Sequence, residues 1–366
     1  MNVLIQLSHP AHFHLYKNVA KNLMADGHKV FILIKTKDIL EDLLKQSGLP
    51  YYNILKEAHR KSKLGIFWDM LVRDWRMLCF VKKNRIDLLT GSTVEVAQVG
   101  WLTRKYRINT GEDDMRVVPM VQKLGGPFMQ TLLSPIVCDN WKLEGKSVKY
   151  ASYHELAYLH PNHFQADKNI VEQYFSTDSP YFILRFASLN AHHDVGIQGI
   201  NTEIAQRLID ILKSHGRIYL TSERELEPQF EPYRIKINTL DMHHVMAFST
   251  LYIGDSQTMA AEAGVLGVPF VRFNDFVGRI GYLNELEDVY HLGVGVKASE
   301  EGAAEKMYEV VEDILALPNL KEEWEARRQK MLSEKIDYAR FLTWFMENYP
   351  ESQRVMKADP NYQYKL

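Results

Sequence analysis

The chain opens with a continuous apolar run at residues 3–7, which is typical of a strand in a parallel sheet that is covered on both faces. Apolar residues then recur at helical spacing from Phe13 to Leu23, and Gly27 follows as a left-handed residue of the kind that often ends a helix. A second apolar run at residues 30–34 completes a βαβ unit. This order of elements predicts an α/β fold with a parallel sheet.

The same alternation of strands and helices continues to residue 109, and it starts again after a linker at 178–180. The elements expected in the first half are helices at 38–46, 64–82 and 94–106 and strands at 51–55, 86–89 and 107–109. Those expected in the second half are strands at 181–187, 217–221, 251–254 and 269–273 and helices at 202–215, 242–248 and 258–266. Two such halves predict two Rossmann-like, doubly wound parallel-sheet domains with an interdomain cleft at the carboxyl ends of their strands.

We therefore divide the chain into three parts. Residues 1–178 are predicted to form the N-terminal domain and residues 179–335 the C-terminal domain. The remaining segment, 336–366, contains a helix at 336–349 that is a candidate to cross back to the first domain. The polar tail from Pro350 onward is expected to be poorly ordered.

The composition is that of an ordinary globular protein, with 46% hydrophobic and 25% charged residues. A net charge of -2 argues against a nucleic-acid partner. The two cysteines, Cys79 and Cys138, exclude a disulfide framework and fit a reducing cytoplasm. The first residues lack the features of a signal peptide, and charges interrupt every apolar segment before the roughly 20 residues of a membrane span. We therefore expect a cytoplasmic protein.

The most informative segment is the turn that follows the predicted strand at 251–254. A helix begins there, and its first backbone N–H groups can bind a phosphate. Glu262 lies deeper in the helix, where a carboxylate on the helix surface would reach the hydroxyls of a ribose. The alternative is an ordinary helix cap with a solvated Glu262. The candidate phosphate- and ribose-binding residues in this segment are Asp255, Ser256, Gln257, Thr258 and Glu262.

Residues 254–269 resemble the nucleotide-sugar signature of GT-B enzymes, in which a Ser/Gly turn holds the diphosphate and a helical Glu binds ribose. The segment is similar both to glycosyltransferases of that fold and to non-hydrolysing UDP-N-acetylglucosamine 2-epimerases. As a whole, the chain most resembles the DUF354 family, whose members open with the same strand and a His-Pro-Ala-His turn. The resemblance implies a GT-B fold and a nucleotide-sugar ligand, with UDP as the expected nucleotide.

The His-Pro-Ala-His turn itself, residues 9–12, follows the first strand, where doubly wound folds bind ligands. The imidazoles of His9 and His12 titrate near neutral pH and are candidate catalytic bases or phosphate donors. In many GT-B transferases the equivalent turn holds glycines and a His, whereas this chain has Pro10 and Ala11. The alternative is that His12 caps the helix and His14 packs against it.

Two further loops follow predicted strands of the first half. Ser92 stands where the epimerases have a catalytic Asp, so one of their acids is missing. Glu112 would correspond to the Glu of that family, and it is a candidate catalytic base for an acceptor hydroxyl. A solvated acidic turn at 112–114 is the alternative.

Basic residues follow strands of the second half. Arg185 is placed to pair with a diphosphate and to stabilise the leaving nucleotide. His192 and His193 lie in the loop after it. Arg279, in the loop 276–279, is expected to close over the sugar or to lie on a plain surface loop.

The sequence lacks the usual motifs for ATP, NAD and zinc binding. The chain has no Walker A loop and no Gly-x-Gly-x-x-Gly fingerprint, so neither ATP nor NAD is expected. The histidines at 154 and 160 are spaced too widely for the helical zinc-protease motif, and we predict no metal and no cofactor.

The basic residues around 56–63 precede a helix that carries Ile66, Phe67, Trp68, Met70 and Leu71. This segment could dock on anionic lipid at the inner membrane face, or it could be a charged loop before an ordinary core helix.

These features favour a glycosyltransferase that moves a sugar from a nucleotide-diphosphate donor, expected to be a UDP-sugar, to an unknown acceptor in polysaccharide or glycan synthesis. The C-terminal domain would bind the donor and the N-terminal domain the acceptor. Two other hypotheses remain open at this point. One is a non-hydrolysing UDP-N-acetyl-sugar 2-epimerase, and the other is a non-catalytic nucleotide-sugar-binding protein.

Overall fold

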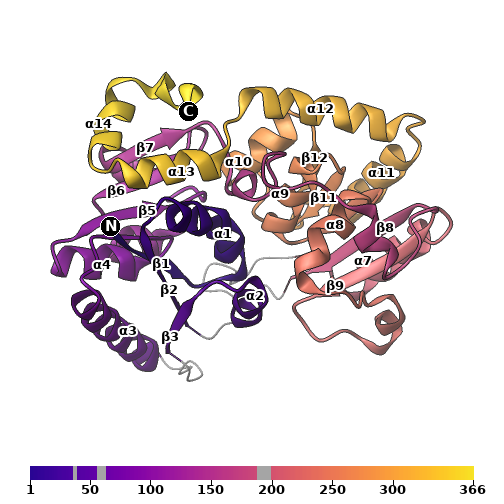
Figure 1. The fold of residues 1–366 in the computed structure, drawn as a ribbon. Coiled ribbons are helices and arrows are strands. Elements are labelled where there is room, and N and C mark those ends of the chain that lie inside the picture. The colour runs from indigo at the N-terminus through magenta and orange to yellow at the C-terminus, as the bar shows by residue number, and fades with distance from the viewer. Residues whose placement is uncertain (36–38, 56–62, 188–198) are drawn as a thin grey trace. The chain divides into compact units, whose positions relative to one another are not determined.

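The computed structural model describes residues 1–35, 39–55, 63–187 and 199–366. The chain divides into two compact units, each of which is described by itself. Unit 1 contains residues 1–158 and 336–366, and unit 2 contains residues 159–335. Each unit is built around one parallel sheet with helices (Figure 1).

The sheet of unit 1 has seven parallel strands in the order β3-β2-β1-β4-β5-β6-β7. The chain adds strands on one side of β1 and then reverses to the other side, so the topological switch point lies between β1 and β4. The strands are β1 (Asn2–Leu7), β2 (Lys29–Lys35), β3 (Tyr51–Leu55), β4 (Leu88–Gly91), β5 (Tyr106–Thr110), β6 (Thr131–Pro135) and β7 (Ser147–Tyr150).

Helices pack on this sheet with their apolar sides inward. Leu4 of β1 and Leu33 of β2 share a core cluster with Met77 and Val96 from the covering helices. The helices are α1 (Pro10–Ala25), α2 (Leu40–Ser47), α3 (Lys63–Lys83), α4 (Val94–Leu102), α5 (Pro119–Leu124), α13 (Tyr338–Glu347) and α14 (Glu351–Ala358), with 3-10 turns η1 (Trp141–Lys146), η2 (His154–Ala157) and η6 (Pro360–Lys365).

The sheet of unit 2 has five parallel strands in the order β12-β11-β10-β8-β9, and its switch point lies between β8 and β10. The strands are β8 (Tyr181–Phe186), β9 (Arg217–Ser222), β10 (Leu251–Gly254), β11 (Phe270–Phe273) and β12 (Gly293–Val296). The helices are α6 (Lys168–Glu172), α7 (Thr202–Leu212), α8 (Met242–Ala247), α9 (Gln257–Val265), α10 (Gly281–Asn284), α11 (Ala303–Leu315) and α12 (Leu320–Glu334), with short turns η3 (Pro228–Tyr233), η4 (Thr239–Asp241) and η5 (Glu285–Val289).

The predicted α/β class with two doubly wound parallel sheets is confirmed. Some elements differ in detail. Helix α4 ends at Leu102, four residues before the predicted end, because Arg104 takes a left-handed φ of 54° that a continuing α-helix does not allow. Three short strands, β6, β7 and β12, are not predicted from the sequence.

Residues 159–178, which the sequence analysis assigns to the first domain, pack within unit 2. The ring of Phe164 lies 4.8 Å from that of His244 on α8. The hydroxyl of Tyr174 donates to Asp241 (2.6 Å). The contacts of this segment therefore tie it to the elements around α8.

The segment from Pro350 onward is ordered, and the expectation of a poorly ordered tail is wrong. The hydroxyl of Ser352 donates to the Phe345 carbonyl (2.6 Å), and Gln363 is buried and accepts from the backbone N–H of Ala151 (2.7 Å). The polar residues of this segment are thus used as internal hydrogen-bond partners within unit 1. Helix α13 packs on α1 in the same unit.

Among the helices in the described part of the chain, none combines the length and the apolar character that crossing a membrane requires.

Candidate functional site

The switch point of unit 2 brings the ends of β8 and β10 together, and the turn after β10 is tightly packed. Gly254 pairs with Arg185 across the two strands. A Cβ atom at Gly254 would lie 2.6 Å from the Tyr252 hydroxyl and 2.8 Å from the Arg185 Cβ atom. No larger residue fits there without displacing its neighbours, so glycine allows the end of β10 to pack closely against β8. Ligands of doubly wound folds bind at such switch points.

Asp255 ties three strand ends together. Its side chain is fully buried and accepts from the backbone N–H of Ala187 (2.6 Å), just beyond β8. The amide of Asn274, just beyond β11, donates to the Asp255 carbonyl (2.9 Å). Burial raises the pKa of the Asp255 carboxyl to about 6. The carboxyl therefore faces the interior of the unit, which suits a positioning residue.

The next three residues form the accessible part of the turn. Ser256 is the N-cap of α9, and its hydroxyl accepts from the backbone N–H of Met259 (3.4 Å). Ser256, Gln257 and Thr258 are half-buried, and the first turn of α9 contains no acidic residue. No carboxylate within this first turn competes for the positive end of the helix dipole, and the carboxyl of the preceding Asp255 accepts from Ala187 instead, which suits an anion at the turn.

Glu262 does not lie on the helix surface, and that part of the prediction is wrong. Its carboxylate is buried, and Oε1 lies 2.9 Å from Nε2 of His243 on α8. The reason is that α9 is enclosed beyond its first turn, where Ala260, Ala261 and Ala263 are also fully buried. A contact between Glu262 and ribose stays a prediction.

The two predicted arginines have different surroundings. Arg185 is half-buried, donates to the Thr221 hydroxyl (2.8 Å) and forms an ion pair with Glu223, so its guanidinium is directed along the end of β9. Arg279 is exposed and lies over the ring of Phe276, 5.4 Å from its centroid. His192 and His193 lie outside the described residues.

At the switch point of unit 1, the two predicted histidines have different partners. His9 is the N-cap of α1, and its Nδ1 atom accepts from the backbone N–H of Ala11 (3.2 Å). The alternative that His12 caps this helix is therefore wrong. The Nδ1 atom of His12 lies 3.3 Å from both the backbone N and the hydroxyl of Ser8.

Tyr16, which the sequence analysis missed, fixes this end of α1 over the sheet. Its hydroxyl lies 2.9 Å from the hydroxyl of Thr90 and 3.1 Å from that of Thr110, at the ends of β4 and β5. Ser92 joins the same network through Thr110 (2.8 Å). Burial raises the pKa of Tyr16 to about 12, so the phenol stays protonated. His12 lies four residues before Tyr16, so the two side chains lie on the same face of α1.

Glu112 is held by His154, and the alternative of a solvated carboxylate is wrong for this residue. Its carboxylate accepts from the backbone N–H of His154 (2.7 Å), and Oε2 lies 3.2 Å from the imidazole Nδ1 atom. Burial raises the pKa of Glu112 well above its usual value and lowers the pKa of His154 to about 3. The imidazole is therefore neutral. The spacing of His154 and His160 predicts no zinc motif, and nothing local in the sequence pairs His154 with Glu112.

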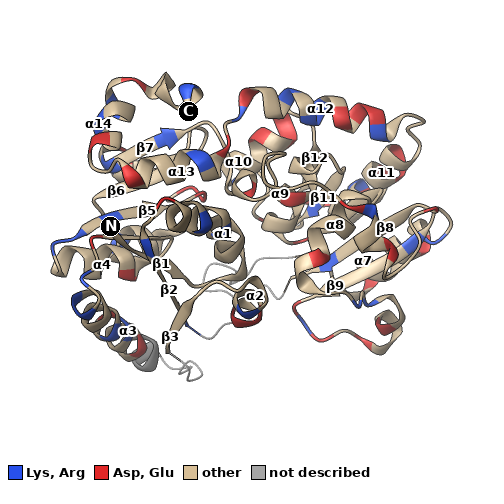
Figure 2. Ribbon diagram, in the orientation of Figure 1, with Lys and Arg blue, Asp and Glu red and all other residues tan. Residues whose placement is uncertain are grey.

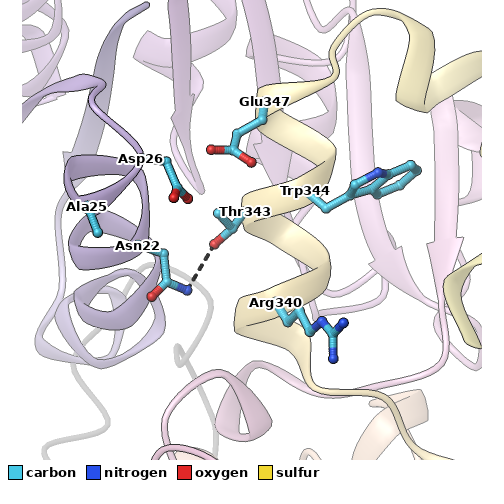
Figure 3. Close-up of a pocket in the computed structure, with 7 residues that line it drawn as sticks. All are labelled: Asn22, Ala25, Asp26, Arg340, Thr343, Trp344 and Glu347. Atoms are coloured by element: carbon cyan, nitrogen blue, oxygen red, sulfur yellow. Dashed lines mark hydrogen bonds between the residues drawn. The ribbon is translucent and has the colours of Figure 1, made fainter. Parts of the chain in front are cut away.

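A shallow pocket of about 300 Å³ lies elsewhere in unit 1, between α1 and α13 (Figure 3). The amide of Asn22 donates to the Thr343 hydroxyl (3.3 Å), which links the two helices at this pocket. None of the predicted site residues lines it. Its lining residues are Asn22, Ala25, Asp26, Arg340, Thr343, Trp344 and Glu347. The described residues contain no group of three or more His, Cys, Asp or Glu side chains arranged to hold a metal ion.

Solved structures of known proteins share this fold. One is a co-structure of MnaA with UDP from S. aureus, with 11% identity over 95% of each chain and a TM-score of 0.66. Another is a putative UDP-N-acetylglucosamine 2-epimerase from Listeria monocytogenes, with 12% identity over 92% of each chain and a TM-score of 0.60. A third is the spinosyn rhamnosyltransferase SpnG complexed with thymidine diphosphate, with 15% identity over 95% of this chain and 100% of that chain and a TM-score of 0.61.

These likenesses confirm the predicted GT-B fold, and at such identities they show the fold alone. No curated protein matches the sequence significantly. Residues 1–279 match the family described as "Protein of unknown function (DUF354)". The match spans both switch points and most of the chain, and the protein belongs to the DUF354 family.

Proposed function

We propose that this protein is a glycosyltransferase that uses a nucleotide-diphosphate sugar, expected to be a UDP-sugar. The observation that carries the proposal is the turn after β10. There, at the switch point of unit 2, the first turn of α9 contains no acidic residue and its first residues are half-buried, so they are partly accessible. A diphosphate is the kind of anion that such a helix end binds.

In this proposal, unit 2 binds the donor. The backbone N–H groups of the first turn of α9 and the Ser256 hydroxyl bind the diphosphate, and Asp255 holds the turn in place. Arg185 leaves its ion pair with Glu223 and pairs with the diphosphate, and its positive charge then stabilises the departing nucleotide. Glu262 binds the ribose. The nucleotides named for structures of the same fold, UDP and thymidine diphosphate, are consistent with such a ligand.

Unit 1 would bind the acceptor and supply the base. His12 is the stronger candidate, because His9 is already used as the helix cap. His12 would take the proton of an acceptor hydroxyl as the bond to the sugar forms and the nucleotide diphosphate leaves. Glu112 is held by His154, which makes it better suited to positioning than to proton transfer.

A second candidate function is epimerisation of a UDP-N-acetyl sugar. The fold shared with a putative epimerase favours it. Two observations on unit 1 weigh against it. The place of one catalytic acid is taken by Ser92, which bonds to Thr110, and the other acid, Glu112, faces His154. A binding protein without catalysis would keep the α9 turn and have no need of His12.

The test is to screen nucleoside diphosphates and nucleotide-sugars by thermal shift and to incubate the best ligand with and without candidate acceptors. Ligand at about 100 times its Kd should add about 2.7 kcal/mol of stability. A transferase releases the nucleotide diphosphate mainly when acceptor is present, whereas an epimerase interconverts two sugar isomers without acceptor. Failure of every nucleotide to stabilise the protein would refute nucleotide-sugar binding as a whole.

A further inference from the structure

Helix α3 has an apolar outer face as well as an apolar inner face. On the inner side, Met77 and Val81 belong to the core cluster of unit 1. On the outer side, Trp68, Leu71 and Trp75 are 55%, 43% and 67% exposed. Their spacing of three and four residues places these three side chains on one face of the helix. Two tryptophans so exposed on one helix face are typical of an interaction surface for a protein or a membrane.

The charges around this face have one sign. Every exposed charged side chain between residues 68 and 85 is basic, whereas the two acids in that range, Asp69 and Asp74, are half-buried. Residues 63–85 hold six Lys or Arg and two Asp or Glu, a net charge of +4, although the whole chain carries -2. Figure 2 marks the basic positions of α3 in blue. The exposed basic residues are Arg76, Lys82, Lys83 and Arg85.

We propose that the α3 face, which consists of Trp68, Leu71 and Trp75 with the basic residues Arg76, Lys82, Lys83 and Arg85, binds the surface of an anionic lipid bilayer. Indole rings favour the boundary between headgroups and acyl chains, and lysine and arginine attract anionic headgroups. The aliphatic Leu71 between the two indoles suits acyl chains better than stacked bases. This proposal does not depend on sugar transfer.

The described residues extend such a contact toward the C-terminal end of α3. The sequence analysis places it on the basic residues at 56–63 and the apolar residues up to Leu71. Residues 56–62 lie outside the described residues, and the described basic side chains that accompany the tryptophans run from Arg76 to Arg85, at and just beyond the C-terminal end of the helix. Each basic residue near an anionic surface contributes about fivefold to the partition coefficient, and salt screens this contribution.

The first test is sedimentation with vesicles of phosphatidylcholine alone or with 30% phosphatidylglycerol. We expect binding to the anionic vesicles, and we expect raised salt to weaken it. Lys82→Glu with Lys83→Glu should lower the partition coefficient at least about tenfold, whereas Lys306→Glu with Lys321→Glu on unit 2 should change it little. Trp68→Ser with Trp75→Ser should also lower it about tenfold, and Met120→Ser, at an exposed apolar position on α5, should not.

A second readout uses Cys79, which lies four residues after Trp75 and is exposed, while Cys138 is buried. An environment-sensitive fluorophore on Cys79 should shift its emission to the blue with anionic vesicles. The same fluorophore in a Cys79→Ser, Ser214→Cys variant should not respond.

Several results would overturn the proposal. The proposal is wrong if the folded wild type does not bind anionic vesicles at low salt. It is also wrong if both sets of α3 variants bind them as well as the wild type does. Dimerisation in solution that the Trp68→Ser, Trp75→Ser variant abolishes would instead assign the face to a second copy of the chain. Binding of RNA or DNA that needs Lys82 and Lys83, without vesicle binding, would assign it to a nucleic acid.

Discussion

The carboxylate of Glu262 and the imidazole of His243 contact each other inside unit 2, with Oε1 2.9 Å from Nε2 and both side chains buried. The pair joins α9, which begins at the candidate phosphate-binding turn, to α8. A buried hydrogen-bonded pair is costly to break, because the remaining partner is left without a hydrogen bond. The contact therefore gives Glu262 a structural role that is separate from any role in binding.

The first prediction concerns this pair. Glu262→Ala and His243→Ala should each lower the free energy of unfolding by about 1–3 kcal/mol, and the double variant should lower it by less than the sum. Urea unfolding measures all three. If Glu262 also binds ribose, then Glu262→Ala weakens nucleotide binding in the folded protein and His243→Ala, the matched control, does not. Additive effects on unfolding would show that the two side chains do not depend on each other.

The second prediction concerns the turn after β10. Gly254→Ala should lower the free energy of unfolding by about 1–3 kcal/mol, because the added Cβ atom meets the Tyr252 hydroxyl and Arg185. Gly145→Ala is the matched control, since a Cβ atom there meets nothing within 4 Å. That substitution should be neutral or stabilising by up to about 1 kcal/mol. Equal effects of both changes in thermal unfolding would contradict the close packing of the turn.

The third prediction is a pH dependence of stability due to Asp255. Burial raises its pKa to about 6 in the folded state, above the unfolded value of about 3.9. The folded state therefore binds more protons between these values, and the contribution of Asp255 to stability falls as pH rises from about 4 to about 6, by on the order of 2 kcal/mol.

Asp255→Asn removes this titration and keeps an oxygen that can accept from Ala187. The free energy of unfolding of the variant minus that of the wild type should therefore increase between pH 4 and pH 6. Chemical unfolding at intervals of half a pH unit measures the difference. A flat difference curve would mean that Asp255 titrates alike in the folded and unfolded states.

The fourth prediction separates the two histidines of the first turn. Once a nucleotide-sugar and an acceptor are known, His12→Ala should lower turnover by ~10²–10⁴-fold and leave nucleotide affinity nearly unchanged. His9→Ala should instead lower stability by about 1 kcal/mol, because it removes the cap of α1. Unchanged turnover in His12→Ala would remove His12 as the base.

The fold could be predicted from the sequence where the signal is local. The apolar run of β1, the helical spacing of α1 and the glycine after it identify the first βαβ unit without any tertiary information, and Gly27 has the expected left-handed φ of 83°. Strand β12 gives no such signal, because two of its four residues are glycines. A Cβ atom at Gly293 would lie 2.4 Å from the ring of Phe270, so that glycine is required by a neighbouring strand.

The candidate site shows the same division. The turn at Ser256 was located correctly because strand, polar turn and helix are contiguous. The surroundings of Glu262 and Glu112 could not be predicted in this way. Their partners, His243 and His154, lie 19 and 42 residues away in sequence. Whether a carboxylate is solvated or buried depends on such distant partners. The role of each predicted residue in binding or catalysis stays a prediction.

The assignment of residues 336–366 to unit 1 has a consequence for biosynthesis. In chain order, unit 2 is an insertion within unit 1, and the ribosome completes unit 2 before the last helices of unit 1 emerge. Until then, α1 lacks α13, and the backbone N–H of Ala151 lacks its Gln363 acceptor. Unit 2 has all its residues in one uninterrupted stretch and can fold first, even though residues 1–158 of unit 1 are synthesised before it.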